Sequence, residues 1–158
     1  MTPNQKAFLD LIASSEIGPK MLAQSDNGYN VLVGSMPGRL LLMANYDDHP
    51  AKVMRIEMKG KIIFSSAAGR YQLLTRYWRA YKKMLRLSDF SPASQDAVAL
   101  QQIKEQGAFA SIEAGDIATA VDKCKNIWAS FPGAGYGQHE VQLSKLLAAY
   151  VNAGGKLA

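Results

Sequence analysis

The sequence predicts an α+β fold, mostly helical, with one small β-region inserted after the first helix. Three observations carry this prediction: apolar residues at helical spacing near the N-terminus, short apolar runs between turn signals from about Met21 to Phe64, and helical patterns from Gly69 onward. The chain has 158 residues, which fits a single domain over 1–158. Its 48% hydrophobic and 20% charged residues exclude a disordered chain.

The first helix is expected to begin at Pro3. Thr2 can cap it, Pro3 suits the first helical position, and Gln5 can return a hydrogen bond to Thr2. A stripe of inward positions follows at helical spacing: Phe8, Leu11, Ile12 and Ser15. Gly18 and Pro19 are expected to end the helix.

The β-region shows a different pattern, in which four short apolar runs alternate with turn signals. The turn signals are Asn27-Gly28, Pro37-Gly38, His49-Pro50 and Gly60. The apolar runs are residues 29–33, 40–43, 53–58 and 62–64. This alternation predicts a small antiparallel sheet or an irregular β-lobe.

Four helical patterns follow. The first stripe comprises Tyr71, Leu74, Trp78, Tyr81 and Leu85. A second helix is expected from a Ser91 cap and Pro92 to Gly107, with Ala97, Leu100 and Ile103 facing inward. A third follows an Asp116 cap, with the stripe Ile117, Ala120, Val121, Cys124 and Trp128. A last helix is expected around Val141 to Val151.

The charge balance favours an anionic partner. There are 18 basic and 13 acidic residues, a net charge of +5, which suits nucleic acid, an anionic membrane or peptidoglycan. A basic run, interleaved with aromatic residues, comprises Arg70, Arg76, Arg79, Lys82, Lys83 and Arg86. Because most of the aromatic residues fall on the core side of a helix, we interpret the run as a solvated face and expect no nucleic-acid partner.

The sequence predicts no membrane span, signal peptide, internal disulfide or metal site. Apolar runs are too short for a membrane span, and the N-terminus lacks the basic start of a signal peptide. The single cysteine, Cys124, allows no internal disulfide, fits a reducing cytoplasm and falls on an apolar stripe as a core thiol. His49 and His139 are isolated, so no metal site is predicted.

Glu16 is the most informative residue. It lies on the apolar face of the first helix and at the C-terminal end of that helix, where the dipole is negative. Burial and the dipole both disfavour the carboxylate, so both should raise its pKa, as a general acid requires. From the spacing alone, an exposed glutamate at a frayed helix end is the alternative.

Two glycine-containing segments could contribute to binding. In the segment from Ser65 to Leu74, Gly69 allows close backbone approach and Gln72 offers donors and acceptors; an ordinary helix start is the alternative. The loop from Phe131 to Gln138 places Tyr136 among three glycines but lacks the context of a phosphate loop. It fits a mobile aromatic lip over a cleft, or a plain turn.

These segments together resemble the bacteriophage lambda endolysin family, which are lysozyme-fold lytic transglycosylases. The matching segments are QKAFLDLIASSE, GYNVLVG, DDHP, AGRYQLL, DFSPASQDAVALQQIKEQGA, GDIATAVDKCKNIWASFPGAGYGQ and NAGG. The resemblance covers nearly the whole chain. It implies a lysozyme-like domain with a substrate cleft between its helical part and its β-lobe.

The resemblance also assigns roles. Glu16 matches the family's single catalytic glutamate, and Ala67-Ala68-Gly69-Arg70-Tyr71-Gln72 has the form A-x-G-x-x-Q, whose glutamine contacts the sugar. We take Ser66, Tyr71, Gln72 and Tyr136 as the substrate-binding residues. Two flexible lips would lie at residues 54–64 and 126–139.

The chain departs from the family pattern at several positions. Ile17 follows the glutamate where the family usually has glycine, and Ala67 and Asn30 replace a glycine and an acid. The stretch from Ser35 to Ala44 is longer and more apolar than its counterpart, and could be a hairpin, a membrane-touching loop or a contact surface.

The resemblance implies cleavage of peptidoglycan glycan strands between N-acetylmuramic acid and N-acetylglucosamine, giving 1,6-anhydromuramoyl ends and host lysis. No cofactor or metal is implied. We expect a monomer that waits in the host cytoplasm and reaches the wall once another protein permeabilises the inner membrane. The alternatives are a hydrolytic muramidase using Asp26 as second carboxylate, and a non-catalytic binding module for cell wall or nucleic acid.

Overall fold

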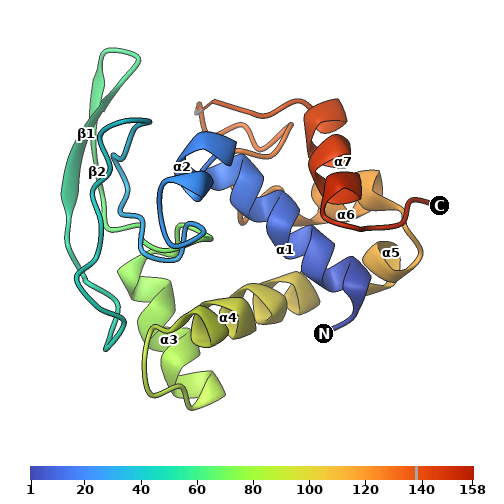
Figure 1. Ribbon diagram of the computed structural model, residues 1–158, viewed down its shortest axis with the longest axis horizontal. Helices are drawn as coiled ribbons and strands as arrows, with labels where there is room; N and C mark the ends of the chain where they lie inside the picture. Colours follow the sequence, from blue (N-terminus) through green and yellow to red (C-terminus); the bar gives the residue numbers. More distant parts are fainter. Residues whose placement is uncertain (138) are drawn as a thin grey trace. The chain divides into compact units, whose positions relative to one another are not determined.

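The computed structural model describes residues 1–137 and 139–158 and has the predicted α+β class (Figure 1). The helices and strands, in chain order, are α1 (Pro3–Glu16), α2 (Pro19–Ala23), β1 (Met54–Met58), β2 (Lys61–Ser65), α3 (Thr75–Leu85), α4 (Pro92–Glu105), α5 (Phe109–Glu113), α6 (Ile117–Cys124) and α7 (Leu143–Asn152). Within the described residues, no helix is both long enough and apolar enough to cross a membrane.

The chain divides into two compact units. The helical unit comprises residues 1–16 and 99–158, and the hairpin unit comprises residues 17–98. The single domain expected over 1–158 stays a prediction.

In the helical unit, α1 packs against α5 and α7. The predicted capping box is present, because Gln5 N–H donates to Thr2 Oγ1 over 3.1 Å and Thr2 N–H donates to Gln5 Oε1 over 3.2 Å. The inward face of α1 is fully buried at Phe8, whose ring meets Phe131 edge-on at 6.4 Å. The remaining buried residues of α1 are Ala7, Leu9, Leu11, Ile12 and Ala13.

The α6 predictions are also confirmed. The Asp116 side chain accepts from Thr119 N–H over 3.2 Å, and all five stripe residues, including Trp128 just beyond the helix, are buried. Burial raises the pKa of the Cys124 thiol to about 12, which leaves it an unreactive core thiol. The short α5 was not predicted, because five residues between Gly107 and Gly115 show no periodicity.

The face of α4 that is buried differs in part from the face that was predicted. Ile103 is fully buried, but Ala97 and Leu100 are only partly buried, and Val98 and Ala99 take the innermost positions. The apolar spacing of this helix is nearly continuous, so periodicity alone does not select the face.

In the hairpin unit, β1 and β2 pair antiparallel, with Arg55 opposite Phe64 and Glu57 opposite Ile62. The two earlier apolar runs are not strands. Their backbones meet in an irregular hairpin, which forms an isolated bridge between Val31 and Leu42. Regular strand pairing is interrupted in this hairpin, because the Ser35 hydroxyl accepts from the Leu41 N–H over 2.9 Å in place of a backbone carbonyl. The stretch from Ser35 to Ala44 therefore forms the turn and the second arm of this irregular hairpin.

The predicted stripe from Tyr71 is wrong at its start, since α3 begins at Thr75. Residues 68–73 form a tight turn instead, in which Ala68 and Leu73 exchange backbone hydrogen bonds of 3.1 and 2.9 Å. Gly69 and Gln72 both have positive φ, at 79° and 49°, which a helix cannot accommodate. Local periodicity could not reveal this turn, because Ala68 also pairs with the distant Leu32.

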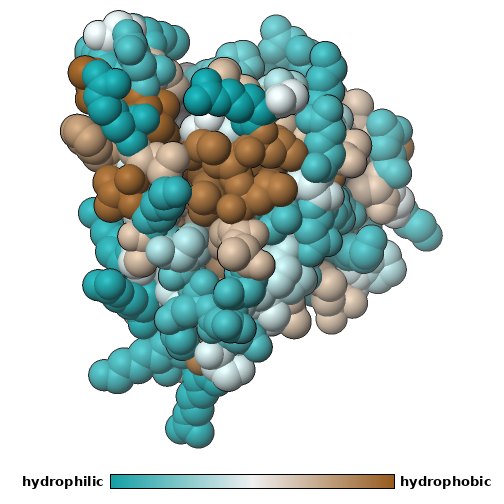
Figure 2. All heavy atoms as spheres, turned by 60° about the vertical axis from the view of Figure 1, so that its left-hand side comes forward, coloured by the Kyte–Doolittle hydropathy of each residue, from teal (hydrophilic) through white to brown (hydrophobic). Residues whose placement is uncertain are grey.

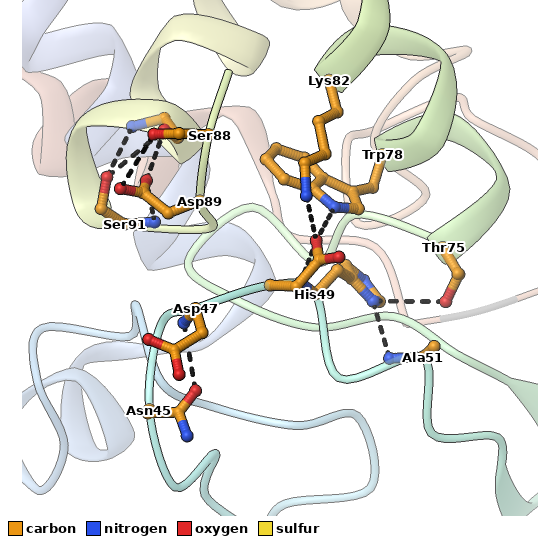
Figure 3. Close-up of polar contacts among 12 residues, drawn as sticks. Asn45, Asp47, His49, Ala51, Thr75, Trp78, Lys82, Ser88, Asp89 and Ser91 are labelled. Atoms are coloured by element: carbon orange, nitrogen blue, oxygen red, sulfur yellow. Dashed lines mark hydrogen bonds and ion pairs between the residues drawn. The ribbon is translucent and has the colours of Figure 1, made fainter.

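The core of the hairpin unit forms around Trp78 and Phe90, whose rings meet edge-on at 4.8 Å. Trp78 Nε1 donates to Asp48 Oδ1 over 2.6 Å, and Lys82 Nζ lies 3.1 Å from the same oxygen (Figure 3). Most of the basic run is exposed as predicted, but Arg70 is not. Arg70 is buried, and its guanidinium lies 5.1 Å from the centre of the Tyr29 ring.

His49 is a buried structural residue. Its Nδ1 lies 3.0 Å from the Ala51 backbone nitrogen (Figure 3). Its Nε2 lies 2.8 Å from the Leu73 carbonyl oxygen, so the neutral ring with hydrogen on Nε2 satisfies both contacts. Burial lowers the pKa of His49, which favours that neutral ring. Within the described residues, no group of three or more His, Cys, Asp or Glu could hold a metal ion.

Candidate active site

Glu16 is the last residue of α1 and is partly buried. Its Oε1 accepts from the Ser130 hydroxyl over 2.5 Å. The Ser130 oxygen in turn accepts from the Ser15 hydroxyl over 2.7 Å. Two serine hydroxyls, one from the helix itself and one 114 residues away, therefore form a chain of hydrogen bonds that ends on this carboxyl group.

The surroundings of Glu16 favour its protonated form. Burial raises the pKa of the carboxyl group and is the largest effect, while hydrogen bonds from the hydroxyl and the backbone amide of Ser130 lower it. The net direction is upward, as the position at the end of an apolar face predicted. A carboxylic acid with a raised pKa can donate a proton near neutral pH.

The raised pKa gives Glu16 a pH-dependent effect on stability. The unfolded carboxyl group has a pKa of about 4.3, and the folded one is higher. The folded state therefore loses stability as the pH rises from the unfolded to the folded pKa. Glu16→Gln should match the wild type in melting temperature near pH 4 and exceed it at pH 7, as thermal denaturation across a pH series can measure. A variant less stable than the wild type at pH 7 would contradict this.

The A-x-G-x-x-Q segment is held by a residue that the sequence analysis missed. The Gln95 side chain accepts from Arg70 N–H over 2.9 Å and donates to the Phe90 carbonyl over 2.9 Å. A Cβ at Gly69 would lie only 2.2 Å from Gln95 Oε1, so glycine is required by close approach as well as by its positive φ. Gln72 donates its own amide to the Gly69 carbonyl over 2.9 Å.

Tyr71 is buried rather than presented to solvent. Its hydroxyl donates to Asp96 Oδ1 over 2.6 Å, and the Tyr29 hydroxyl donates to the same oxygen over 2.9 Å. Burial, together with the Asp96 charge, raises the pKa of Tyr29 to about 12. This arrangement ties Tyr71 into the interior of the hairpin unit and leaves Gln72 as the polar side chain at the turn.

Ser66 and Tyr136 have different surroundings. The Ser66 hydroxyl accepts from Thr75 N–H over 3.2 Å at the start of α3. Tyr136 is 58% exposed and donates to the Asn126 carbonyl over 3.1 Å. Of the predicted site residues, Glu16 and Tyr136 belong to the helical unit, while Ser66, Tyr71 and Gln72 belong to the hairpin unit.

The backbone of the glycine loop binds a carboxylate from the same chain, that of Glu140. Glu140 accepts from Gly133 N–H over 2.9 Å and from Gly135 N–H over 3.0 Å. Backbone amides in such a loop form an anion-binding nest, and here a carboxylate fills it. The predicted loop reached Gln138, which lies outside the described residues.

The Asp26 carboxylate contacts a distant residue and not its own turn. Its Oδ2 accepts from the Tyr46 hydroxyl over 2.6 Å. Other side chains hold the turn instead: Asn30 Oδ1 accepts from Asp26 N–H over 3.0 Å, and Ser25 Oγ accepts from Gly28 N–H over 3.0 Å. Tyr46 is 20 residues away in sequence, so local turn rules could not predict this pair.

A partly buried glutamate at the end of the first helix, followed along the chain by a β-hairpin and a helical remainder, defines a lysozyme-like protein. The solved structure of bacteriophage lambda lysozyme complexed with a chitohexasaccharide has this fold, with a TM-score of 0.90 and 50% identity over 100% of this chain and 98% of that chain. A second structure of lambda lysozyme matches with a TM-score of 0.85 at 49% identity, over 100% of this chain and 98% of that chain.

The endolysin family model matches residues 6–157, so the chain belongs to the endolysin family. It is 53% identical to the endolysin of Escherichia phage lambda over 96% of this chain and 91% of the relative. It is 45% identical to the endolysin of Escherichia phage P2, over 96% of this chain and 93% of that relative. The class is therefore that of phage enzymes that degrade peptidoglycan.

Proposed function

We propose that this endolysin is a lytic transglycosylase, which cleaves the glycan strand between N-acetylmuramic acid and N-acetylglucosamine and leaves a 1,6-anhydromuramoyl end. The observation that carries the proposal is Glu16: a partly buried carboxyl group with a raised pKa, held by Ser130. The complex of lambda lysozyme with a chitohexasaccharide supports a glycan as the ligand.

Glu16 is the general acid in this proposal. Its proton passes to the glycosidic oxygen as the bond to C1 breaks, and an oxocarbenium-like transition state develops. The C6 hydroxyl of the same muramic acid then attacks C1, and the Glu16 carboxylate accepts the hydroxyl proton. Because the attacking hydroxyl is already part of the reacting sugar, proximity replaces a second catalytic carboxylate.

Two of the four binding roles are kept as the sequence analysis has them: Gln72 binds the sugar, and Tyr136 covers the strand with its exposed ring. Ser66 and Tyr71, which were expected to bind substrate, are assigned a supporting role instead, because their hydroxyl groups contact Thr75 and Asp96. Since Tyr71 is buried, its contribution is to fix the turn that presents Gln72. We propose a monomer that acts on the wall after release from the host cytoplasm.

A hydrolytic muramidase is the second candidate, because the Asp26 carboxylate is exposed. A hydrolase needs a second carboxylate to activate water or to act as nucleophile. A non-catalytic binding module is the third candidate, and the family membership weighs against it.

Digestion of purified sacculi tests the proposal directly. The turbidity of the suspension and the number of reducing ends are followed together. We expect clearing without new reducing ends, because the anhydro ring blocks the sugar terminus. Clearing with one reducing end per cleaved bond would establish the muramidase, and no clearing would leave the binding module.

Ser130 is proposed to position Glu16 and to adjust its proton affinity. Ser130→Ala removes a hydrogen bond that lowers the pKa of Glu16. The pKa should then rise further, and the alkaline limb of the activity–pH profile should move to higher pH, with a rate loss of about tenfold. Ser130→Thr keeps the hydroxyl and should restore the profile. An unmoved limb in Ser130→Ala would limit Ser130 to a structural role.

A further inference from the structure

Tyr136 is the only exposed aromatic side chain among the described residues of the helical unit, which also contains Glu16. The hairpin unit differs, because it exposes several apolar side chains, and Figure 2 shows hydrophobic side chains among hydrophilic ones on that side of the molecule. Since Tyr136 is 58% exposed, packing in the core does little to fix its ring. The position of the ring depends on the glycine loop that carries it.

The two ends of the glycine loop are fixed. Val141 N–H donates to the Ser130 carbonyl over 2.8 Å, which joins the chain on either side of the loop. Phe131 is fully buried, and its ring meets that of Phe8 at a centroid distance of 6.4 Å. Ser130 is also the residue whose hydroxyl donates to Glu16. The base of the loop is therefore tied both to the core and to the surroundings of Glu16.

The middle of the glycine loop has no such packing. Apart from its chain neighbours, a Cβ at Gly135 would meet no described atom within 4 Å, and one at Gly133 would meet only the Lys125 side chain, at 3.9 Å. Both glycines have positive φ, at 76° and 77°. Glycine loses more conformational freedom on ordering than any other residue. Polar contacts must therefore hold this part of the loop in one conformation.

Glu140 supplies these polar contacts from the C-terminal end of the loop. Its two carboxylate oxygens accept from Gly133 N–H over 2.9 Å and from Gly135 N–H over 3.0 Å. Hydrogen bonds to a charged acceptor are roughly twice as strong as neutral ones. Tyr136 follows directly after Gly135, and its hydroxyl donates to the Asn126 carbonyl over 3.1 Å. The carboxylate therefore fixes the backbone immediately before the exposed ring.

We propose that Glu140 is a positioning residue for glycan binding: its carboxylate holds the glycine loop in the conformation that presents Tyr136 to the sugar. This inference rests on the proposed role of Tyr136 in covering the strand. When only a fraction of the molecules has the binding-competent loop, the apparent dissociation constant rises in inverse proportion to that fraction. Loss of the Glu140 contacts should therefore raise KM and leave kcat, which depends on Glu16, nearly unchanged.

Glu140→Gln tests the contacts with little change in shape. The amide NH2 group cannot accept, so one glycine N–H loses its acceptor. On soluble, uncross-linked glycan strands, KM should rise about fivefold and kcat should change less than about twofold. The alkaline limb of the activity–pH profile should stay at its wild-type pH, unlike that of Ser130→Ala. Glu113→Gln makes the same change where the side chain accepts from the Thr2 hydroxyl, and should keep the wild-type KM.

Amide hydrogen exchange observes the loop without any substrate. The N–H groups of Gly133 and Gly135 should exchange at least about tenfold faster in Glu140→Gln than in the wild type. Val141 N–H, whose acceptor is the Ser130 carbonyl, should keep its rate and serves as the internal control. Unchanged exchange at both glycines would overturn the proposal, whatever happens to KM.

A double-mutant cycle with Tyr136→Ala separates this proposal from the proposed function. Tyr136→Ala should raise KM about tenfold through the lost sugar contact. Adding Glu140→Gln should then change KM less than about twofold, because Glu140 acts through Tyr136. Effects that multiply in the double variant, or a wild-type KM in Glu140→Gln alone, would overturn the role of Glu140 and leave that of Tyr136 intact. A wild-type KM in Tyr136→Ala would overturn the proposed role of Tyr136 and this inference with it.

Discussion

Glu16→Gln is expected to abolish lysis while leaving the protein folded. Glutamine has nearly the same shape and can still accept from the Ser130 hydroxyl, so the end of α1 should be undisturbed. It cannot donate a proton and recover it, and general acid catalysis contributes about a hundredfold to ten-thousandfold. The turnover of purified sacculi should fall by at least that range.

A matched control is available in the same unit. Glu113→Gln makes the same chemical change at the end of α5, where the side chain accepts from the Thr2 hydroxyl. This control should retain full activity. A Glu16→Gln variant that keeps a tenth of the wild-type turnover would show that Glu16 is not the acid.

Trp78→Ala should cause the largest loss of stability. Trp78 is 1% exposed, packs against Phe90 and donates its indole N–H to Asp48. Removal of a fully buried tryptophan costs about 3–5 kcal/mol through lost burial and the cavity left behind. For a chain of this size the melting temperature should fall by roughly 6–20 °C.

Two further variants serve as comparisons for the stability loss of Trp78→Ala. Tyr77→Ala removes the neighbouring aromatic residue, which is 45% exposed, and should cost less than about 1 kcal/mol. Trp78→Phe keeps much of the volume but loses the hydrogen bond to Asp48, so its melting temperature should be intermediate. Equal melting temperatures for Trp78→Ala and Tyr77→Ala would contradict the assignment of Trp78 to the core.

The features predicted well from sequence depend on neighbouring residues. The Thr2–Gln5 capping box and the Asp116 cap involve groups three residues apart. Glu16 was placed correctly because its helix has a clear apolar face and a definite end at Gly18 and Pro19. In each case a short local pattern is enough to predict where the residue lies on its helix.

The features missed by sequence reasoning depend on residues that are distant in the chain. Gln95 accepts from the Arg70 backbone, and Asp96 accepts from the Tyr71 hydroxyl, each across 25 residues. No local sequence pattern predicts either contact. Ser130 contacts Glu16 across 114 residues. The late start of α3 has the same cause, because tertiary pairing of Ala68 with Leu32 overrides the helical spacing of Tyr71 and Leu74.

The chemistry proposed for Glu16 makes a specific demand on the products. With Asp26 bound to the Tyr46 hydroxyl, we assign no second carboxylate to water activation, and the C6 hydroxyl is the attacking group. Asp26→Asn should therefore cost little turnover, and any loss should come from the weakened contact with Tyr46.

Mass spectrometry of the fragments released from purified sacculi tests this most directly. We expect disaccharide-peptides in the anhydro form, each lighter by one water than the product of a muramidase, from both the wild type and Asp26→Asn. Fragments with free reducing ends, together with an inactive Asp26→Asn variant, would contradict transglycosylation and establish hydrolysis by two carboxylates.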